Sequence, residues 1–126
     1  YTGQQSYEYV QTVITAEHSR ALFGKEWASP YASFAPKVAD PLRCRNLTVC
    51  LRDGTVHLQT ITPAADPWLH SLLGHVGAHT GCPCLMNVGL RRRGKPLMNR
   101  ISEALQQLQE AQLDFVVVEG RVFDRI

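Results

Sequence analysis

Residues 80–96 read TGCPCLMNVGLRRRGKP, and this stretch decides how we expect the chain to fold. Its first part, at 83–88, is a short apolar run that predicts a buried strand. Its second part is a basic loop with two glycines that ends at Pro96. An expected helix at 100–112 and an apolar strand at 115–118 follow, and 121–123 extends or pairs with that strand. Residues 83–118 are therefore predicted to form a strand-loop-helix-strand unit with a right-handed crossover.

The N-terminal segments have the same strand and helix character. Alternating residues at 7–14 predict a strand, and 16–23 predict a short helix between the cap Thr15 and Gly24. The runs 47–51 and 55–61 flank Asp53-Gly54, a pair that is typical of a tight turn between antiparallel strands. The sequence therefore predicts an antiparallel hairpin around Asp53-Gly54.

A second helix is expected to begin at Asp66-Pro67, with the aspartate as cap and the proline at the first helical position. Its apolar residues repeat at helical spacing until Gly81. Strands that alternate with helices, together with one hairpin, predict an α/β fold. We expect an open mixed β-sheet with helices packed on it, in one domain covering residues 1–126.

Composition limits the protein class. The chain has 126 residues, of which 44% are hydrophobic and 19% charged, enough for one core without a disulfide or a metal. A net charge of +2 does not by itself indicate nucleic-acid binding. Four cysteines and the lack of a long apolar run favour a cytoplasmic protein with free thiols and no membrane span. The first residue is Tyr1, which hints at an excised piece.

The basic loop is the main functional candidate. It follows the expected strand, and ligands of open α/β sheets bind at the carboxyl ends of strands. One arginine guanidinium group can bind two phosphate oxygens at once, and glycines let backbone N–H groups come close to a ligand. The loop is either a phosphate site or a solvated basic turn. Its candidate residues are Asn87, Gly89, Arg91, Arg92, Arg93, Gly94, Lys95 and Pro96.

The whole stretch 80–96 resembles the signature of the C-terminal domain of O-carbamoyltransferases of the nodulation-factor and antibiotic type. That signature runs Thr-Gly-x-Pro-x-Leu-Leu-Asn-Thr-Ser-Phe-Asn-x-Arg-Gly-Glu-Pro and aligns without a gap. Asp53-Gly54-Thr55 with Gln59-Thr60 resembles the family's hairpin. Ser29-Pro30-Tyr31 resembles its Ser-Pro-Tyr. The resemblance covers about 29–123.

The resemblance implies a YrdC-like domain that binds ATP and carbamoyl phosphate and forms a carbamoyl adenylate. It implies a kinase-like, metal-containing N-terminal domain or subunit as partner, which transfers the carbamoyl group to a hydroxyl of a small-molecule acceptor. It also implies Mg²⁺ bound through the ATP phosphates, with no metal held by this chain. The chain would be a fragment, a split subunit or a reduced stand-alone relative.

The resemblance also implies roles for individual residues. Arg93 and Asn87 would be catalytic: Arg93 would neutralise phosphate charge, and Asn87 would orient the carbamoyl or nucleotide group. The implied nucleotide-binding residues are Gly89, Arg91, Arg92, Gly94, Lys95, Ser29 and His57.

The chain departs from the family pattern beside the expected ligand. Val88, Gly89, Leu90 and Arg91 stand where the family has Thr-Ser-Phe-Asn, and Lys95 replaces its glutamate. Leu51 and His57 replace the family's histidine and arginine around the hairpin, and His57 is either a surface or a pocket residue. The resulting pocket is more basic and carries fewer hydroxyl groups.

Other interpretations stay open at this stage. Four neighbouring residues have side chains that can bind zinc: His75, His79, Cys82 and Cys84. A cysteine and a histidine of this set could also form a nucleophile pair. Small cysteines packed in the core explain the Cys-x-Cys spacing better than either alternative. We expect Trp27 and Trp68 at the edge of the core. The alternative function is a non-catalytic YrdC-like module that binds a nucleotide or RNA, or a subunit that completes a separate kinase-like chain. We do not expect nucleic acid as the main partner.

Overall fold

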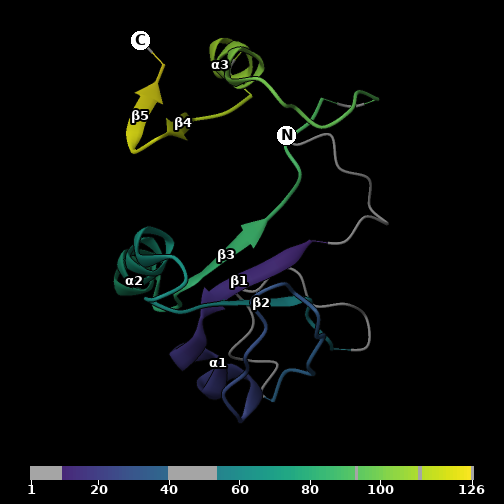
Figure 1. Ribbon diagram of the computed structural model, residues 1–126, viewed down its shortest axis with the longest axis vertical. Coiled ribbons are helices and arrows are strands. Elements are labelled where there is room, and N and C mark those ends of the chain that lie inside the picture. The colour runs from purple at the N-terminus through teal and green to yellow at the C-terminus, as the bar shows by residue number, and fades with distance from the viewer. Residues whose placement is uncertain (1–9, 40–53, 93, 111, 126) are drawn as a thin grey trace. The chain divides into compact units, whose positions relative to one another are not determined.

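The computed structural model describes residues 10–39, 54–92, 94–110 and 112–125, which fall in two compact units (Figure 1). The sheet unit comprises Tyr9–Asn87. The hairpin unit comprises Tyr1–Glu8 and Val88–Ile126. Each unit has its own β-sheet, so each is described by itself.

The sheet unit contains a mixed three-stranded sheet with the order β2-β1-β3. Strand β1, Gln11–Thr15, pairs in parallel with β2, Leu58–Ile61. On its other side β1 pairs antiparallel with β3, Cys84–Asn87 (Figure 1). The predicted open mixed sheet is therefore confirmed.

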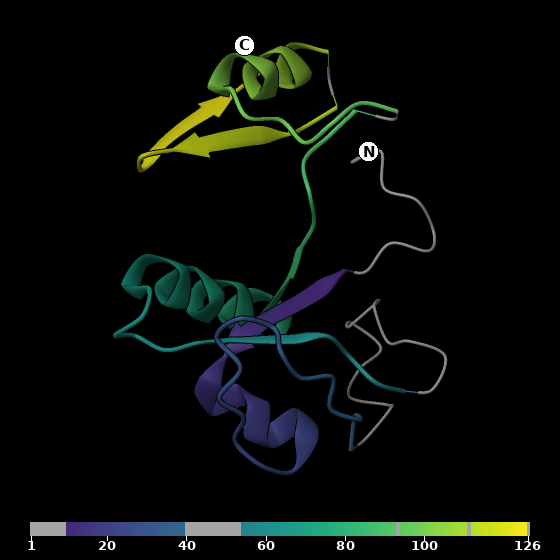
Figure 2. The same ribbon diagram turned by 45° about the vertical axis from the view of Figure 1, so that its right-hand side comes forward.

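Helices cover both faces of this sheet. Helix α1, Ala16–Phe23, and helix α2, Pro67–Thr80, lie on opposite sides of it (Figure 2). Neighbouring residues of β1 point to opposite faces. Accordingly, Ile14 belongs to the buried cluster beside α1, whereas Val13 packs with Leu73 of α2.

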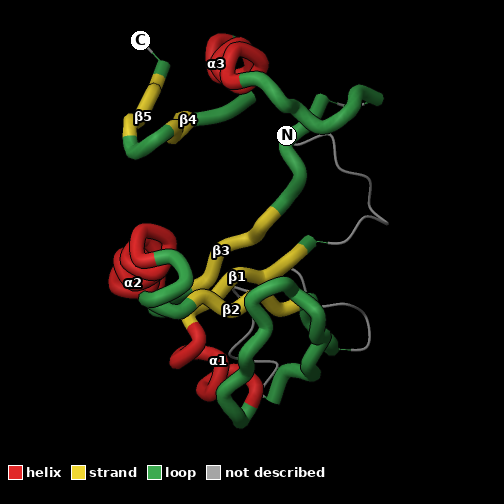
Figure 3. The backbone as a smooth tube through the Cα atoms, viewed as in Figure 1, coloured by secondary structure: helices red, strands yellow, loops and turns green. Residues whose placement is uncertain are grey.

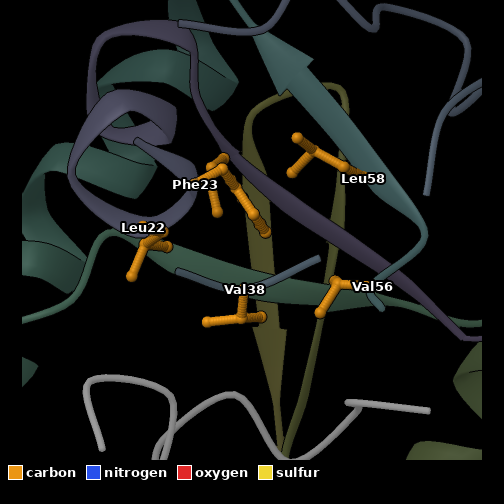
Figure 4. Packing of buried hydrophobic residues seen from close by; sticks show 6 residues of the cluster. Leu22, Phe23, Val38, Val56 and Leu58 are labelled. Carbon is orange, nitrogen blue, oxygen red and sulfur yellow. The ribbon is translucent and has the colours of Figure 1, made fainter. Parts of the chain in front are cut away.

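The larger cluster joins distant parts of the sheet unit. Leu22 and Phe23 from α1 point toward Val38, Val56 and Leu58 (Figure 4). Val56 and Leu58 belong to this cluster, whereas Ile61 belongs to the cluster beside α2, as the alternation of side chains along a strand requires.

The segment before residue 40 runs beside β2 and the residues that precede it. Leu58 N donates to Phe34 O at 3.1 Å, and Val56 N donates to Pro36 O at 3.0 Å. Gly54 has a φ of 80° and its carbonyl accepts from Val38 N at 3.0 Å. The left-handed glycine agrees with a turn at this position, but the expected first strand of the hairpin, at 47–51, lies outside the described residues.

The helix ends of the sheet unit are as predicted. Asp66 Oδ1 accepts from Leu69 N at 2.9 Å, and Pro67 occupies the first helical position of α2. Gly24 and Gly81 end α1 and α2 with φ of 77° and 78°. Only glycine adopts this left-handed conformation without strain, which explains why both helices end there.

The hairpin unit contains helix α3, Ile101–Gln109, and an antiparallel pair of strands (Figure 3). Strand β4, Phe115–Val118, pairs with β5, Arg121–Asp124. Glu119 and Gly120 between them have φ of 48° and 75°. Two consecutive positive φ values are typical of the tight turns whose twist matches a hairpin.

This hairpin corrects the predicted crossover. Strand β4 pairs with β5 in a separate sheet and not with β3 or β1, so residues 83–118 do not form a single-sheet crossover unit. The reason is local, because a two-residue turn brings β5 back onto β4 without a long connection. Residues 121–123 were expected either to extend the strand at 115–118 or to pair with it, and the structure shows pairing.

Two further predictions need correction. Strand β3 is not fully buried: it lies at the edge of its sheet, and the side chain of Met86 is 54% exposed. Helix α3 ends at Gln109 and not at residue 112, and the Glu103 carboxylate caps its first turn. No helix within the described ranges is long and apolar enough to cross a membrane.

Candidate functional site

The basic loop of the hairpin unit is closed by two backbone hydrogen bonds. Met98 N donates to Leu90 O at 3.0 Å, and Lys95 N donates to Arg92 O at 2.9 Å. Gly94, with a φ of 72°, allows the chain to reverse between Arg92 and Lys95. The sequence-predicted loop is thus a tight, backbone-bonded turn that places Arg92 and Lys95 close together.

A pocket of about 340 Å³ lies between this loop and α3. It is large enough for a small ligand, since such pockets start at roughly 300 Å³. A guanidinium and an ammonium group on one side of it favour an anion, and phosphate accepts hydrogen bonds from both. Its lining residues are Arg92, Lys95, Pro96, Met98, Glu103 and Gln106.

The Arg92 side chain is held in place by Glu110. One guanidinium nitrogen, Nη2, lies 2.8 Å from both carboxylate oxygens of Glu110. Gln106 Nε2 also donates to Glu110 Oε1 at 3.0 Å. The pair is about half exposed, so it contributes less than about 1 kcal/mol. An incoming anion would compete with Glu110 for Arg92.

Glu103 brings a negative charge to the same pocket. Its Oε2 accepts from the backbone N–H groups of Asn99 at 3.3 Å and Arg100 at 3.2 Å. These bonds satisfy N–H groups that precede the first turn of α3. Glu103 therefore stabilises the helix start, and the cations of the pocket remain Arg92 and Lys95.

Gly89 and Arg91 lie in the segment that leads from β3 into the basic loop. Arg91 forms an isolated antiparallel bridge with Leu97. A Cβ at Gly89 would lie 2.7 Å from Leu97 Cδ2, so a side chain there would require the exposed Leu97 side chain to shift. Arg93 lies outside the described residues, and its predicted catalytic role stays a prediction.

Asn87 belongs to the sheet unit, at the end of β3. Its Nδ2 donates to Gln11 Oε1 at 3.0 Å, across the antiparallel pair in which the two residues are directly opposite. The side chain is exposed, so a ligand can reach it. The side-chain amide of Asn87 therefore lies on the edge strand β3, where the pairing of β3 with β1 places it beside Gln11.

Ser29 and His57 also belong to the sheet unit. Ser29 is completely buried; its N donates to Thr60 Oγ1 at 2.8 Å, and its carbonyl accepts from Thr60 N at 3.0 Å. His57 is partly exposed, and its carbonyl accepts from Thr12 N at 2.7 Å. The predicted site residues thus divide into Ser29, His57 and Asn87 in the sheet unit, and Gly89, Arg91, Arg92, Gly94 and Lys95 in the hairpin unit.

The cysteines and histidines near residue 80 are not gathered around a common point. His75 Nδ1 lies 2.8 Å from Ser71 O, and His79 Nδ1 lies 2.9 Å from His75 O. Burial raises the pKa of the Cys82 thiol, partly offset by a hydrogen bond with Cys84, and Cys84 packs against the larger core cluster. In the described part of the chain, no group of three or more His, Cys, Asp or Glu residues is arranged to hold a metal ion. Core packing therefore explains both cysteines.

The tryptophans differ from each other. Trp27 packs against the larger core cluster as predicted, whereas Trp68 is 55% exposed, so its predicted place at the core edge is wrong. Trp68 stands in the first turn of α2 and does not belong to the second cluster.

Sequence reasoning missed Glu110 and Gln106. Both lie on or directly after α3 and help to shape the basic pocket. Their spacing of four residues, with a carboxylate and an amide on one helix face, was a readable signal. The partnership of Glu110 with Arg92 was not readable, because it depends on how α3 packs beside the loop.

Comparison with known proteins identifies the family. The family model described as carbamoyltransferase C-terminus matches residues 3–125. The chain belongs to the carbamoyltransferase C-terminus family. The match begins at residue 3, well before Ser29, so it covers more of the chain than the motifs indicated.

Two relatives are 3'-hydroxymethylcephem-O-carbamoyltransferases. The one from Amycolatopsis lactamdurans is 24% identical over 122 residues, which is 97% of this chain and 23% of the relative. The one from Streptomyces clavuligerus is 24% identical over 123 residues, which is 98% of this chain and 23% of the relative. This member of the carbamoyltransferase C-terminus family thus spans about a quarter of the length of these relatives.

Proposed function

We propose that the chain is the C-terminal portion of a carbamoyltransferase that binds ATP and carbamoyl phosphate, forms a carbamoyl adenylate and supports carbamoyl transfer to a hydroxyl of a small molecule. The family match over residues 3–125 supports carbamoyl-transfer chemistry. The observation that carries the phosphate assignment is the pocket beside α3, where Arg92 and Lys95 lie together.

Arg92 offers a guanidinium group that can bind phosphate oxygens. Its guanidinium already contacts a pair of carboxylate oxygens on Glu110, and two phosphate oxygens offer the same kind of acceptor. A phosphate group carries more negative charge than a carboxylate, so it would displace Glu110 when Lys95 contributes a second cation. During adenylate formation these charges would stabilise the phosphate oxygens of the transition state.

The remaining predicted residues extend this proposal. The amide of Asn87 would orient the carbamoyl or nucleotide group by exchanging its bond to Gln11 for one to the ligand. Arg93 would add positive charge next to Arg92. Ser29, His57, Gly89, Arg91 and Gly94 are proposed as nucleotide-binding residues.

The pocket fits phosphate oxygens better than a bare cation. Its donors are a guanidinium and an ammonium group, and its carboxylate, Glu103, already accepts two backbone N–H groups. The Mg²⁺ that accompanies ATP would be held by phosphate oxygens and water.

A proposal about the partner follows from the small share of its relatives' length that this chain spans. Because the chain spans 23% of the relatives, the acceptor would be handled by a kinase-like N-terminal domain or by a separate subunit. We also place the reaction in the cytoplasm, where ATP is supplied.

Calorimetric titration of ATP and of carbamoyl phosphate tests the proposal. Arg92→Ala and Lys95→Ala should each weaken binding roughly 10-fold, the loss of one charge-assisted hydrogen bond. Arg125→Ala is a matched control in the same unit, because Arg125 also pairs with a single carboxylate, that of Asp114 at 3.4 Å. It should leave both affinities unchanged.

Glu110→Gln sharpens the test. Removing the competing carboxylate should strengthen ATP binding, by less than about 5-fold because the pair is solvent-exposed. Equal affinities in all the variants would contradict the phosphate assignment. Salt-sensitive binding of a short RNA without any binding of ATP would favour the alternative of an RNA-binding module.

A further inference from the structure

Cys82 and Cys84 lie on the two sides of a tight turn in the sheet unit. Strand β3 begins at Cys84, so Cys82 precedes the strand. Cys84 N donates to Cys82 O at 2.9 Å, and a hydrogen bond between residues i+2 and i closes a three-residue γ-turn. Pro83 is the central residue of this turn.

The turn brings the two cysteines within reach of each other. In an extended chain, Cα atoms two residues apart are separated by roughly 7 Å, which is the upper limit for a disulfide. A γ-turn shortens this separation. The side chains of Cys82 and Cys84 are hydrogen-bonded to each other, and the structure contains both as thiols. The fold therefore holds two thiols in contact across one proline.

The turn is fixed by its surroundings. The Thr80 hydroxyl accepts from Cys82 N at 3.2 Å and lies 2.9 Å from Cys82 O. A Cβ at Gly77 would lie 2.9 Å from Pro83 Cβ, so the proline packs closely on α2. The proline ring also fixes its own φ. Because the turn is already formed, little entropy is lost when the two sulfur atoms join.

The two thiols differ in how easily a reagent reaches them. Cys82 is 9% exposed, and burial raises the pKa of its thiol. Cys84 is partly exposed, and its Sγ lies 3.8 Å from Leu85 O. Since the thiolate is the nucleophile, a reagent meets Cys84 first, and Cys82 lies next to it as a second thiol. Core packing explains the burial of the two side chains, and their contact with each other is a separate feature.

Thiol chemistry fits this pair better than metal binding. Structural zinc takes four ligands. In the described ranges of the chain, no further His, Cys, Asp or Glu completes a metal site around the two cysteines. We propose that Cys82 and Cys84 are a modification site that reacts with small-molecule disulfides of the glutathione type and closes to an intrachain disulfide.

The reaction consists of two exchange steps. The Cys84 thiol loses its proton to solvent, its thiolate attacks one sulfur of the reagent, and the S–S bond of the reagent breaks to release one reagent thiolate. The Cys82 thiolate then attacks Cys84 Sγ in this mixed disulfide and releases the second reagent thiolate. Two protein thiols are oxidised, one reagent disulfide is reduced to two thiols, and the leaving thiolates take up two protons.

A tryptic peptide isolates this pair for the test. Peptide 53–91 has no internal lysine or arginine, and it contains Cys82 and Cys84 but neither of the other two cysteines of the chain. The folded protein is incubated with oxidised glutathione, the remaining thiols are blocked with N-ethylmaleimide, and the digest is analysed by mass spectrometry. The wild-type peptide should be two hydrogen atoms lighter than the reduced peptide and should carry neither glutathione nor maleimide.

Two single variants separate the roles of the thiols. Cys82→Ser keeps the attacking thiol, so the glutathione adduct on Cys84 should be at least about 10-fold more abundant than in the wild type. Cys84→Ser should react at least about 10-fold more slowly than Cys82→Ser, because only the buried thiol remains. In urea the two variants should react at similar rates, since both thiols are then exposed.

The wild-type mass decides the proposal even where a variant fails to fold. Maleimide on both thiols of the wild-type peptide would overturn the proposal, and so would a glutathione adduct that persists as it does in Cys82→Ser. A disulfide that joins this peptide to another cysteine of the chain would also overturn it. Equal rates of Cys82→Ser and Cys84→Ser in the folded state would contradict the order of the two steps.

Discussion

The sheet unit and the hairpin unit differ in how much apolar surface they bury. Among the described residues, the hairpin unit buries only two hydrophobic side chains, Ala104 and Leu108. The sheet unit has two buried clusters, one on each face of its sheet. Large apolar residues of the hairpin unit, such as Phe115 and Val122, are exposed. Stability is therefore concentrated in the sheet unit, and the basic loop lies in the less well packed unit, as is common for ligand-binding segments.

The same contrast applies to one pocket in each unit. The pocket beside α3 is basic and depends on the side chains of a loop. A pocket of the sheet unit lies beside β2, is mainly apolar and rests on a wall that is hydrogen-bonded to the sheet. Its lining residues are Ala16, Glu26, Trp27, Ala28, Pro30, Thr60, Thr62 and Ala65. The two pockets therefore differ in the charge and polarity of their lining residues.

The largest expected effect comes from truncating one isoleucine in each unit. Ile14→Ala should lower the free energy of unfolding by about 2–5 kcal/mol, because Ile14 is fully buried and the surroundings cannot fill the cavity. Ile101→Ala should change it by less than about 1 kcal/mol, because Ile101 is 55% exposed. Urea unfolding followed by circular dichroism measures both, and equal losses would contradict the contrast between the units.

Two glycines of α2 should respond with opposite sign. A Cβ at Gly77 would lie 2.9 Å from Pro83 Cβ and 3.1 Å from Pro83 N, so Gly77→Ala should destabilise the sheet unit by about 1–3 kcal/mol. A Cβ at Gly74 meets nothing within 4 Å, so Gly74→Ala should stabilise it by about 0.5–1 kcal/mol through helix propensity. Thermal unfolding of both variants measures the difference, and a loss of stability in Gly74→Ala would show that the packing of α2 has been misjudged.

These two helix positions also show what a sequence can predict. The ends of α1 and α2 were predicted correctly because their signals are local: Gly24, Asp66-Pro67 and Gly81 act on adjacent residues. The close approach of Gly77 to Pro83 was not predictable, because it depends on how β3 returns alongside α2.

The sheet to which β4 belongs was predicted wrongly for a related reason. An apolar strand fits either a central sheet or a hairpin, and the pattern of residues 115–118 does not distinguish them. The Glu119-Gly120 turn decides the pairing, and it is a weaker signal than Asn-Gly or Asp-Gly. In the candidate site, the cluster of basic residues was visible in the sequence, whereas its carboxylate partner Glu110 was set by tertiary packing.

The smallest expected effect is a pH dependence in the sheet unit. The pKa of Glu17 lies below its usual value of 4.5, chiefly because its carboxylate accepts a backbone hydrogen bond; burial opposes this, and contact with His70 at 3.3 Å adds to it. The lowered pKa stabilises the folded state above about pH 4.5, and this stabilisation is lost as the pH falls through the pKa of the folded state. Because Glu17 is mostly exposed, the contribution should be below about 0.5 kcal/mol.

Unfolding of the wild type and Glu17→Gln at two pH values tests this. The wild type should be slightly more stable than the variant near neutral pH, and the difference should vanish well below about pH 4. A difference that stays constant between the two pH values would show that Glu17 acts through packing and not through its charge.

The most direct test of the proposed function measures its first chemical step. Carbamoyl phosphate, water and ATP would give carbamoyl adenylate, pyrophosphate and phosphate. Pyrophosphate release from ATP is therefore followed together with phosphate release, with and without carbamoyl phosphate, and the adenylate is identified by mass spectrometry. We predict release that depends on carbamoyl phosphate, a carbamoyl adenylate product, and a rate at least about 10-fold lower in Arg92→Ala, with Arg125→Ala unchanged. Pyrophosphate release that is independent of carbamoyl phosphate, or equal rates in Arg92→Ala and the wild type, would contradict the role given to the basic pocket.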